Sequence, residues 1–335
     1  MSFSIGVDVG GTNIKIGLVD GKGSVVARRR LRTNLNELPE VTLDRISRVV
    51  QGLKPRQEIN SLGIGVAGLV DHRNGVLVFS PNLPLWQRVR VKEVLCRLTG
   101  LDVFCANDAN AFVLGEWLYG AARGYKNVLC VTLGTGVGTG IIVHNRLLLG
   151  GNDFAGELGH STISFGGPNC LCGNRGCLER YVGAQAIVNR ARRLLRKEQK
   201  RLSVTKNQLC LFGITSKSVS RIFELVGYDL NWLTPKEIGR AARKGDKLAM
   251  KVVMETGEFL GKGIYNAIMI LDPEVVVLGG GISGWGRMLL KAVKESVFRR
   301  LYGSDRRLKF VLSELGGDAG ILGASQLSRW LGQFF

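Results

Sequence analysis

GVDVGGTNIKIGLV at residues 6–19 and CVTLGTGVGTGIIV at residues 130–143 are two copies of one pattern, and this pattern decides the fold. Each copy has an apolar stretch, a turn of glycine and threonine, and a second apolar stretch, which predicts a strand–turn–strand hairpin. Glycine at the tips leaves backbone N–H groups exposed. The two tips of this internal duplication can therefore approach one polyphosphate from opposite sides.

The remaining sequence alternates between strand and helix patterns, which predicts an α/β protein. We expect strands at 4–9, 13–19, 24–30, 62–66 and 101–108, and helices at 39–53, 89–98 and 184–201. A third glycine cluster, in VVVLGGGIS at 275–283, ends another apolar strand and precedes a helix. The second hairpin should open a second domain. We predict a smaller domain of 1–118 plus a C-terminal helix at about 318–335, and a larger domain of 119–317. Residues 197–235 show no assignable pattern.

Composition indicates a globular protein of two domains, because 45% of the 335 residues are hydrophobic. The sequence does not open with a signal-peptide pattern, and no apolar run approaches the roughly 18 residues of a membrane span. We therefore expect a cytoplasmic protein without a membrane partner.

The formal net charge of +19 raises the possibility of nucleic-acid binding. The charge is densest at 190–201, which we interpret as a solvated helix face. ITSKSVSRIFELV at 214–226 has a faint similarity to a helix-turn-helix segment. We do not expect nucleic acid as a partner, since an anionic nucleotide substrate would also benefit from a positive field.

The first hairpin carries groups suited to a phosphate and its magnesium ion. Asp8 precedes the turn, Thr12 follows it, and Lys15 lies further along the second strand. No GxxxxGK[ST] motif occurs, so this is not a P-loop protein. LGTGVGTG also lacks the GxGxxG spacing of a dinucleotide fold, which argues against a dehydrogenase.

Two further polar residues, Asp108 and Asn82, are candidates for the site. Asp108 follows an apolar strand, so it can be a general base for a sugar hydroxyl or the N-cap of the next helix, and the local sequence does not decide between these. Asn82, in SPNLPLW, is by its local sequence a turn residue.

A cluster of cysteines indicates a metal site. CLCGNRGC spans 170–177 and follows GELGH at 156–160, so His160, Cys170, Cys172 and Cys177 supply the ligands of a closed tetrahedral structural zinc site. Gly173 and Gly176 would allow the tight turn. The chelate would draw together Glu157 and Glu179, a pair of acceptors suited to a polyol.

The other cysteines and histidines carry no predicted chemistry. We interpret Cys96, Cys105, Cys130 and Cys210 as small buried hydrophobic residues. His72 and His144 have no carboxylate or cysteine partner nearby in sequence, and we expect both at the surface or in turns.

The order of these motifs is similar to that of a known family. DVGGT, PNLPLW, NDANA, LGTGVGTG, GELGH, CLCGNRGCLE and LGGG resemble, in this order, the ROK family of repressors, open reading frames and kinases, most closely its glucokinases. The resemblance implies a two-lobed, actin-like (ribonuclease H-like) sugar kinase fold with a structural zinc site. ATP would bind in the cleft between the lobes.

The resemblance also implies roles for individual residues. Asp108 becomes the general base, and the sugar ligands are Asn82, Asn107, Asp108, Glu157, His160 and Glu179, with His160 touching both sugar and zinc. The residues that would bind ATP are Asp8, Gly10, Gly11, Thr12, Lys15, Gly134, Thr135, Gly136 and Gly138 for the phosphates, with Gly279, Gly280 and Gly281 near the adenosine. Mg²⁺ would accompany ATP, and a homodimer or homotetramer is expected.

The function predicted from these observations is ATP-dependent phosphorylation of a hexose, D-glucose to glucose 6-phosphate. Kinases for fructose, mannose or an N-acetylhexosamine are the alternatives among enzymes, and a sugar-responsive transcriptional regulator is the alternative from another class. Family repressors carry an N-terminal helix-turn-helix domain, whereas five residues precede Gly6 here, which favours a kinase. Residues 197–235 would be an insertion relative to typical members.

Overall fold

Two five-stranded sheets of the same topology form the centre of the protein. The computed structural model describes residues 2–53, 59–201, 220–302 and 307–331. The first sheet has the order β3 (Val25–Arg32), β2 (Asn13–Asp20), β1 (Phe3–Val9), β4 (Ile59–Val66), β7 (Val103–Asn107). The second has the order β10 (Arg146–Leu147), β9 (Val137–Val143), β8 (Val128–Leu133), β11 (Val275–Gly279), β12 (Lys309–Leu312). The predicted internal duplication is confirmed.

Strand pairing follows the same rule in both sheets. The first three strands in each order pair antiparallel, and the last two join the sheet in parallel. The two predicted hairpins are β1–β2, whose last ladder pair is Val9 with Ile14, and β8–β9, whose last pair is Leu133 with Val137. Each hairpin therefore presents its glycine and threonine turn at a sheet end.

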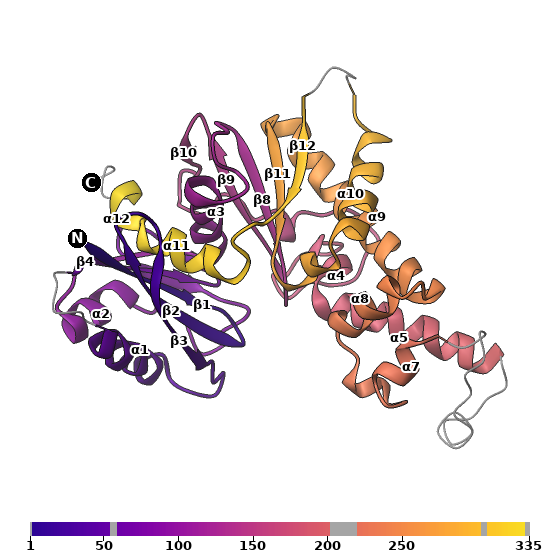
Figure 1. Cartoon of the computed structure of the whole chain (residues 1–335), viewed down its shortest axis with the longest axis horizontal. Coiled ribbons are helices and arrows are strands. Elements are labelled where there is room, and N and C mark those ends of the chain that lie inside the picture. The colour runs from indigo at the N-terminus through magenta and orange to yellow at the C-terminus, as the bar shows by residue number, and fades with distance from the viewer. Residues whose placement is uncertain (1, 54–58, 202–219, 303–306, 332–335) are drawn as a thin grey trace.

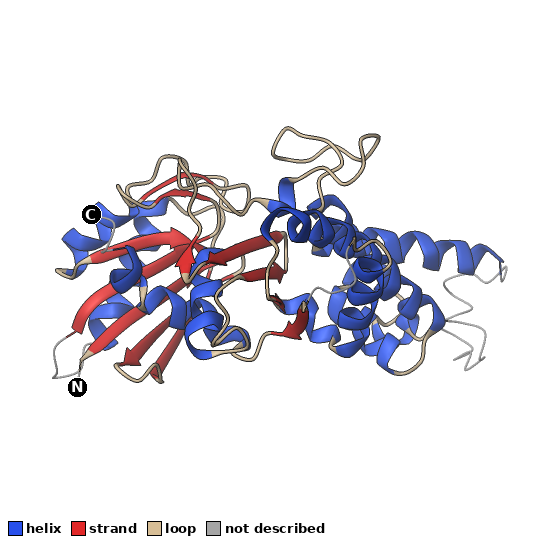
Figure 2. Ribbon diagram, turned by 90° about the horizontal axis from the view of Figure 1, so that it is seen from above, coloured by secondary structure: helices blue, strands red, loops and turns tan. Residues whose placement is uncertain are grey.

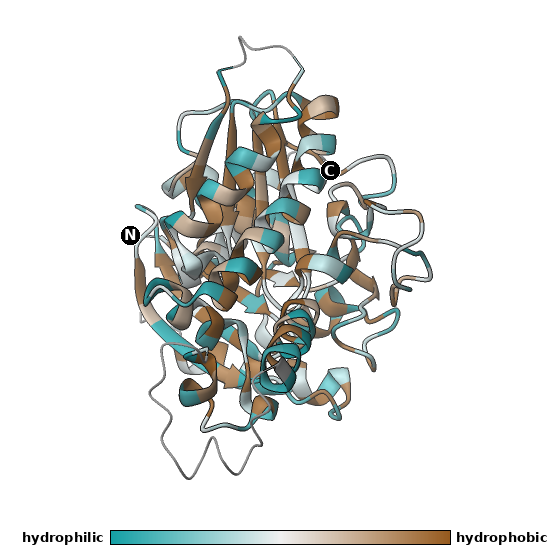
Figure 3. Ribbon diagram, turned by 90° about the vertical axis from the view of Figure 1, so that its right-hand side faces the viewer, coloured by the Kyte–Doolittle hydropathy of each residue, from teal (hydrophilic) through white to brown (hydrophobic). Residues whose placement is uncertain are grey.

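Helices cover the sheets on both faces (Figures 1 and 2). On the first sheet, α1 (Pro39–Leu53) and α2 (Val91–Thr99) bury a shared apolar cluster with β1, β2 and β4. On the second, α5 (Ala184–Arg201), α8 (Pro235–Arg243), α9 (Lys247–Leu271) and α10 (Arg287–Phe298) pack on the face away from the first sheet. The strands of that sheet are mostly apolar, whereas the helices over them alternate between apolar and polar residues (Figure 3).

Short elements complete the described chain. These are β5 (Leu69–Asp71), β6 (Val76–Phe79), α4 (Glu179–Val182), α7 (Ile222–Leu225) and α12 (Leu327–Leu331), with 3₁₀ turns at Leu158–His160, Leu230–Trp232, Gly281–Trp285 and Gly316–Asp318. No described helix is both long enough and apolar enough to span a lipid bilayer.

Two helices, α3 (Asp108–Tyr119) and α11 (Ala319–Ser325), cross between the sheets. α3 follows a strand of the first sheet but packs on the second, while α11 follows the second sheet and packs on the first. Their backbones meet directly, because a Cβ on Gly323 would lie 1.6 Å from the carbonyl oxygen of Ala111. A Cβ on Gly115 would likewise lie 2.1 Å from that of Ala319.

Most predicted elements have the expected positions, and several differ. The helix at 39–53 is confirmed, but β4 begins at Ile59, earlier than predicted, and the C-terminal helix is two short helices, α11 and α12. Residues 202–219, which include Cys210 and half of the suspected helix-turn-helix segment, lie outside the described residues. The other half forms α7, whose Ile222 and Phe223 are buried in the core.

The interpretation of 190–201 as a solvated face is wrong for Arg190, which is buried. Its guanidinium donates to the carbonyl oxygen of Tyr181 at 2.9 Å and to the hydroxyl of Thr256, and lies 3.5 Å from Glu255. Two of its nitrogens are hydrogen-bonded and the Glu255 carboxylate offsets the charge, so a basic residue is tolerated in the interior.

The helix crossing predicts a sharp difference between two glycines. Gly323→Ala should lower the free energy of unfolding by more than about 3 kcal/mol, because the new methyl group collides with backbone that cannot move aside. Gly52→Ala in α1, where nothing lies within 4 Å of the new methyl, should be neutral or stabilising by about 0.4–1 kcal/mol. Urea unfolding of the two variants measures the contrast, and equal stabilities would contradict the described crossing.

Candidate functional site

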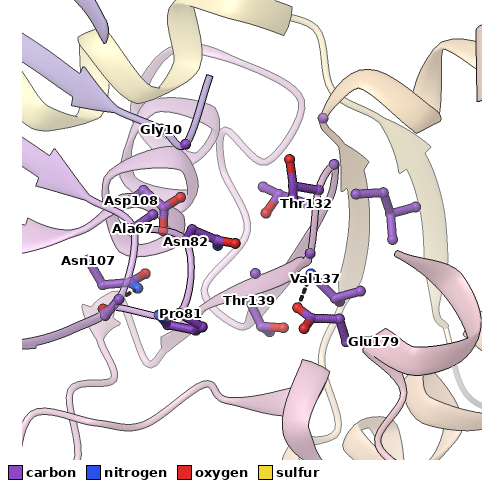
Figure 4. Close-up of a pocket in the computed structure, with 18 of the residues that line it drawn as sticks. Gly10, Ala67, Pro81, Asn82, Asn107, Asp108, Thr132, Val137, Thr139 and Glu179 are labelled. Atoms are coloured by element: carbon purple, nitrogen blue, oxygen red, sulfur yellow. Dashed lines mark hydrogen bonds between the residues drawn. The ribbon is translucent and has the colours of Figure 1, made fainter. Parts of the chain in front are cut away.

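A cavity of about 510 Å³ lies between the tips of the two hairpins. Asn82, Asn107 and Asp108 approach it from one side, and Thr132, Val137 and Glu179 from the other (Figure 4). Its lining includes Asp8, Gly10, Gly11, Thr12, Lys15, Asn82, Asn107, Asp108, Gly134, Thr135, Gly136, Gly138, Glu157, His160, Cys172, Glu179 and Gly280. The duplicated motifs and the polar candidates therefore meet in one place.

The hairpin tips are held in turns that leave backbone N–H groups near the cavity. In the first tip Gly10 N donates to the carbonyl oxygen of Asn13, and Thr33 Oγ1 donates to that of Gly10 at 2.7 Å. In the second, Gly134 N donates to Gly136 at 3.0 Å. Lys15 Nζ lies 2.9 Å from Asp8 Oδ2, which places a cation and a carboxylate beside the first tip.

Asn107, not Asp108, caps α3. Asn107 Oδ1 accepts from the backbone N–H groups of Ala109 at 2.8 Å and Asn110 at 3.2 Å, and its Nδ2 donates to the carbonyl oxygen of Gly68 at 2.9 Å. Asp108 is the first residue of the helix and accepts one bond, from Ala109 N at 3.0 Å. Asn107 therefore caps the helix, and the second carboxyl oxygen of Asp108 is available to a ligand in the cavity.

The surroundings of Asp108 make its carboxyl a weak acid. Burial raises its pKa to about 7, and the nearby carboxylates of Asp8 and Glu157 act in the same direction, while the N–H of Ala109 opposes them. A carboxyl with a pKa near neutral pH can both take up and release a proton there, as a general base must.

Glu179 is attached to the second hairpin. It begins α4, and its Oε2 accepts from Val137 N at 3.0 Å (Figure 4). A Cβ on Gly136 would lie 2.2 Å from this oxygen, so only glycine allows the carboxylate to approach the tip so closely. Glu157 also lines the cavity. Burial raises its pKa, and the charge of Glu179 acts in the same direction, against the effect of His160.

His160, Cys170, Cys172 and Cys177 form one cluster, with ligand atoms all within 4.8 Å of one another. His160 Nδ1 lies 3.6 Å from Cys170 Sγ, and Cys172 Sγ lies 3.8 Å from Cys177 Sγ. Zn–S bonds of about 2.3 Å in a tetrahedron require S···S separations of about 3.8 Å, so the donor set and its spacing fit zinc. Gly173 and Gly176 both have positive φ, as the predicted tight turn requires.

The cluster is also chemically prepared for a cation. Burial and the neighbouring thiols raise the pKa of Cys177 to about 12, so this thiol would hold a proton that a divalent cation displaces. Nε2 of His160 points the other way, 4.0 Å from Glu157 Oε2. The histidine therefore faces the thiols with one nitrogen and the cavity with the other.

Sequence comparison agrees with this geometry. The family model described as "ROK family" matches residues 4–330. The chain belongs to the ROK family. A glucokinase of Thermotoga maritima is 36% identical over 326 residues, covering 97% of this chain and 96% of that protein. A xylose repressor of Caldicellulosiruptor bescii is 29% identical, covering 95% of this chain and 76% of the repressor.

A solved ROK structure has the same fold. The ROK glucokinase of Streptomyces griseus, in complex with glucose and AMPPNP, matches with a TM-score of 0.82 and 33% identity over 98% of this chain and 99% of that one. The α/β fold of the ROK kinases is therefore the fold of this protein.

The cavity does not include every residue predicted from the ROK resemblance. Gly280 lines it, but Gly281 does not, and a Cβ on Gly279 would collide with the Phe112 ring, so Gly279 makes room for packing. Cys170 and Cys177 are buried behind the cavity wall.

Several lining residues were not singled out from the sequence. They are Asn13, Ala67, Gly68, Leu69, Phe79, Pro81, Thr132, Leu133, Val137 and Thr139. Thr132 and Thr139 lie within the second hairpin motif, so the sequence alone could have indicated their hydroxyl groups as candidate ligands. Gly68 acts through its carbonyl group, for which a sequence carries no signal.

The prediction that His72 and His144 lie at the surface or in turns is confirmed, since both lie in turns. His144 is exposed between β9 and β10. His72 is buried, its backbone N–H donates to Asp153 at 3.2 Å, and burial lowers its pKa. Of the cysteines expected in the interior, Cys105 and Cys130 are buried and Cys96 is partly buried.

The raised pKa of Asp108 predicts a pH-dependent effect on stability. The folded protein holds this proton up to about pH 7, whereas the unfolded chain releases it near 3.8, so relative stability is lost as pH rises between these values. Asp108→Asn should therefore raise the Tm of the ligand-free protein at pH 8, with a gain that shrinks toward pH 4. Scanning calorimetry across this range measures it, and a gain independent of pH would contradict the assignment.

Proposed function

We propose that this protein is an ATP-dependent hexose kinase that converts D-glucose to glucose 6-phosphate. The observation that carries the proposal is the Asp108 carboxyl, with a pKa of about 7, in a cavity between two glycine-tipped hairpins. A base of this strength next to two sets of backbone N–H donors is suited to phosphoryl transfer to a hydroxyl group.

The acceptor side of the cavity is suited to a polyol. Hydrogen-bonding groups from both sides of the cavity are supplied by Glu157, His160, Glu179, Asn107 and Asn82, and both glutamates can accept from sugar hydroxyl groups. The glucose bound to the Streptomyces griseus relative supports glucose as the acceptor. Fructose, mannose and N-acetylhexosamines remain the alternative acceptors.

In the proposed reaction the sugar 6-hydroxyl attacks the γ-phosphorus of ATP in line. The O–P bond forms as the bond to the leaving ADP oxygen breaks, and the hydroxyl proton passes to Asp108. The tips that include Gly10–Thr12 and Gly134–Gly136 bind the phosphates, and Lys15 adds a cation. Mg²⁺ bound with ATP would neutralise phosphate charge, and Asp8 is the carboxylate placed to hold it.

The His160 and cysteine cluster would hold a structural zinc ion. Glu157 lies three residues before His160, and Glu179 lies two residues after Cys177, so the metal fixes both carboxylates from behind. Four protein ligands leave no position open for catalysis, and the zinc ion therefore supports the sugar site structurally.

A sugar-responsive regulator is the second candidate, favoured by the xylose repressors among the relatives. Salt-dependent, sequence-selective DNA binding without ATP turnover would support it. Our proposal also includes a cytoplasmic location and a homo-oligomer. It divides the chain into one lobe of 1–118 with 318–335 and a second lobe of 119–317. The packing of α11 and α12 with β1 and β4 supports this division.

Replacement of the base tests the reaction. Asp108→Asn should lower kcat at least about 100-fold, the contribution of a general base, while glucose still binds. In the wild-type enzyme, kcat/KM should fall as pH drops through about 7, because protonated Asp108 cannot accept the proton. A coupled assay over a hexose panel measures both, and near-normal turnover by Asp108→Asn would refute the assignment.

Removal of the metal tests the cluster. The purified protein should contain about one zinc ion per chain, and Cys177→Ser should lose it and weaken glucose binding more than ATP binding. Cys96→Ser is the matched control, because Cys96 lies outside the cluster. Elemental analysis and calorimetric titration give the result. Metal-free protein with wild-type glucose affinity would exclude the proposed role.

A further inference from the structure

Glu116 is a fully buried carboxylate that lies outside the cavity. It is in the last part of α3, and none of its surface is exposed. A buried carboxylate is costly unless hydrogen bonds replace its water shell. The partners of Glu116 therefore indicate why this residue is present.

The partners come from the two segments that connect the two sheets. Oε2 accepts from Ala121 N at 2.9 Å, in the segment that leaves α3 for the second sheet. Oε1 accepts from Leu315 N at 3.1 Å and from the hydroxyl of Ser313, in the segment that leads from β12 to α11. One carboxylate thus joins the end of α3 to the approach to α11.

The surrounding packing fixes this arrangement. A Cβ on Gly120 would lie 2.3 Å from Glu116 Oε2, so the first segment passes directly over the carboxylate. Trp117 Nε1 donates to the carbonyl oxygen of Tyr125 at 2.8 Å, which holds the same segment further along. Cys130 faces the site from β8, and burial followed by the Glu116 charge raises the pKa of its thiol well above the usual range.

The two helices joined by Glu116 are next to two acidic groups of the cavity, Asp108 and Asp8. α3 begins with Asp108. α11 lies against Asp8, because a Cβ on Gly320 would be 2.8 Å from Asp8 Cγ. Strand pairing through β4 holds the backbones of Asp8 in β1 and of Asn107 in β7. Asp108 is the first residue of α3, so a shift of α3 along α11 would turn the Asp108 carboxyl relative to Asp8.

We propose that Glu116 is a positioning residue for phosphoryl transfer, which fixes α3 against α11 and thereby sets the placement of Asp108 relative to Asp8. The inference rests on the proposed kinase function. A carboxylate is required because all of the named partners are donors, and an amide at this position would present N–H groups to some of them. Positioning errors of about 1 Å can reduce turnover by about 100-fold.

The experiment compares Glu116→Gln with Asp246→Asn. Asp246 is the matched control: a buried carboxylate that accepts from Ala249 N, Arg221 N and the Ser220 hydroxyl, at the start of α9 and away from the cavity. Each protein is assayed well below its own Tm for kcat, for hexose KM and for the pH dependence of kcat/KM. The titration of the Asp108 carboxyl is followed by ¹³C NMR without substrates, with Asp108→Asn for assignment.

Glu116→Gln should lower kcat about tenfold or more with hexose KM within about threefold of wild type. The pKa of Asp108 should fall below about 7, because burial still raises it but the Asp8 carboxylate lies less close, while Glu157 stays in place. Asp246→Asn should lower Tm without either change. If Glu116→Gln does not fold, Ser313→Ala removes one donor and should shift both readouts in the same direction by less.

The inference would be overturned if Glu116→Gln behaved like Asp246→Asn, with a lower Tm but with unchanged kcat and an unchanged pKa of Asp108. A raised KM at constant kcat would overturn it as well. If the wild-type protein phosphorylates no hexose, the proposed function fails, and the NMR titration still decides whether Glu116 positions Asp108.

Discussion

The backbone contact between α3 and α11 is the constraint on which the rest of this structure depends. Gly323 lies against the carbonyl oxygen of Ala111, and Gly115 against that of Ala319, so the two helices have essentially one register. Each helix comes from one half of the duplication and packs on the other half. The cavity exists where it does because this crossing brings the ends of the two equivalent sheets together.

The residues of the site around this crossing lie on two kinds of element, rigid sheet ends and short turns. Asp8 and Asp108 are held by sheet ends and by the crossing helices, which have little freedom to move. Glu157, His160 and Glu179 lie instead on short turns, which cannot fix side chains by themselves. The bond from Val137 N holds Glu179, and a zinc ion in the cysteine cluster would hold the turns of Glu157 and His160.

The sequence predicted what depends on local pattern and missed what depends on distant contacts. The hairpins, α1 and the cysteine turn follow from alternation, periodicity and glycine, and all are present. The local sequence does not decide whether Asp108 is a general base or the N-cap of α3. The hydrogen bonds of Asn107 show that Asn107 is the cap. The sequence predicts a solvated position for Arg190 because its buried partner Thr256 is 66 residues away. For the same reason the sequence gives no indication that Glu116 is buried, since its partner Leu315 is 199 residues away.

The charges inside and outside the cavity have opposite signs, and this contrast fits the proposed reaction. The chain carries a formal charge of +19, yet the cavity gathers Asp8, Asp108, Glu157 and Glu179, with Lys15 as its lysine. A positive surface raises the local concentration of an anionic nucleotide. In the proposed reaction the carboxylates inside would bind a neutral polyol. Burial, together with the charges of Asp8 and Glu157, raises the pKa of Asp108, so the base is strong enough to accept a hydroxyl proton. A cavity of uniform positive charge would bind the nucleotide but would lower this pKa and weaken the base.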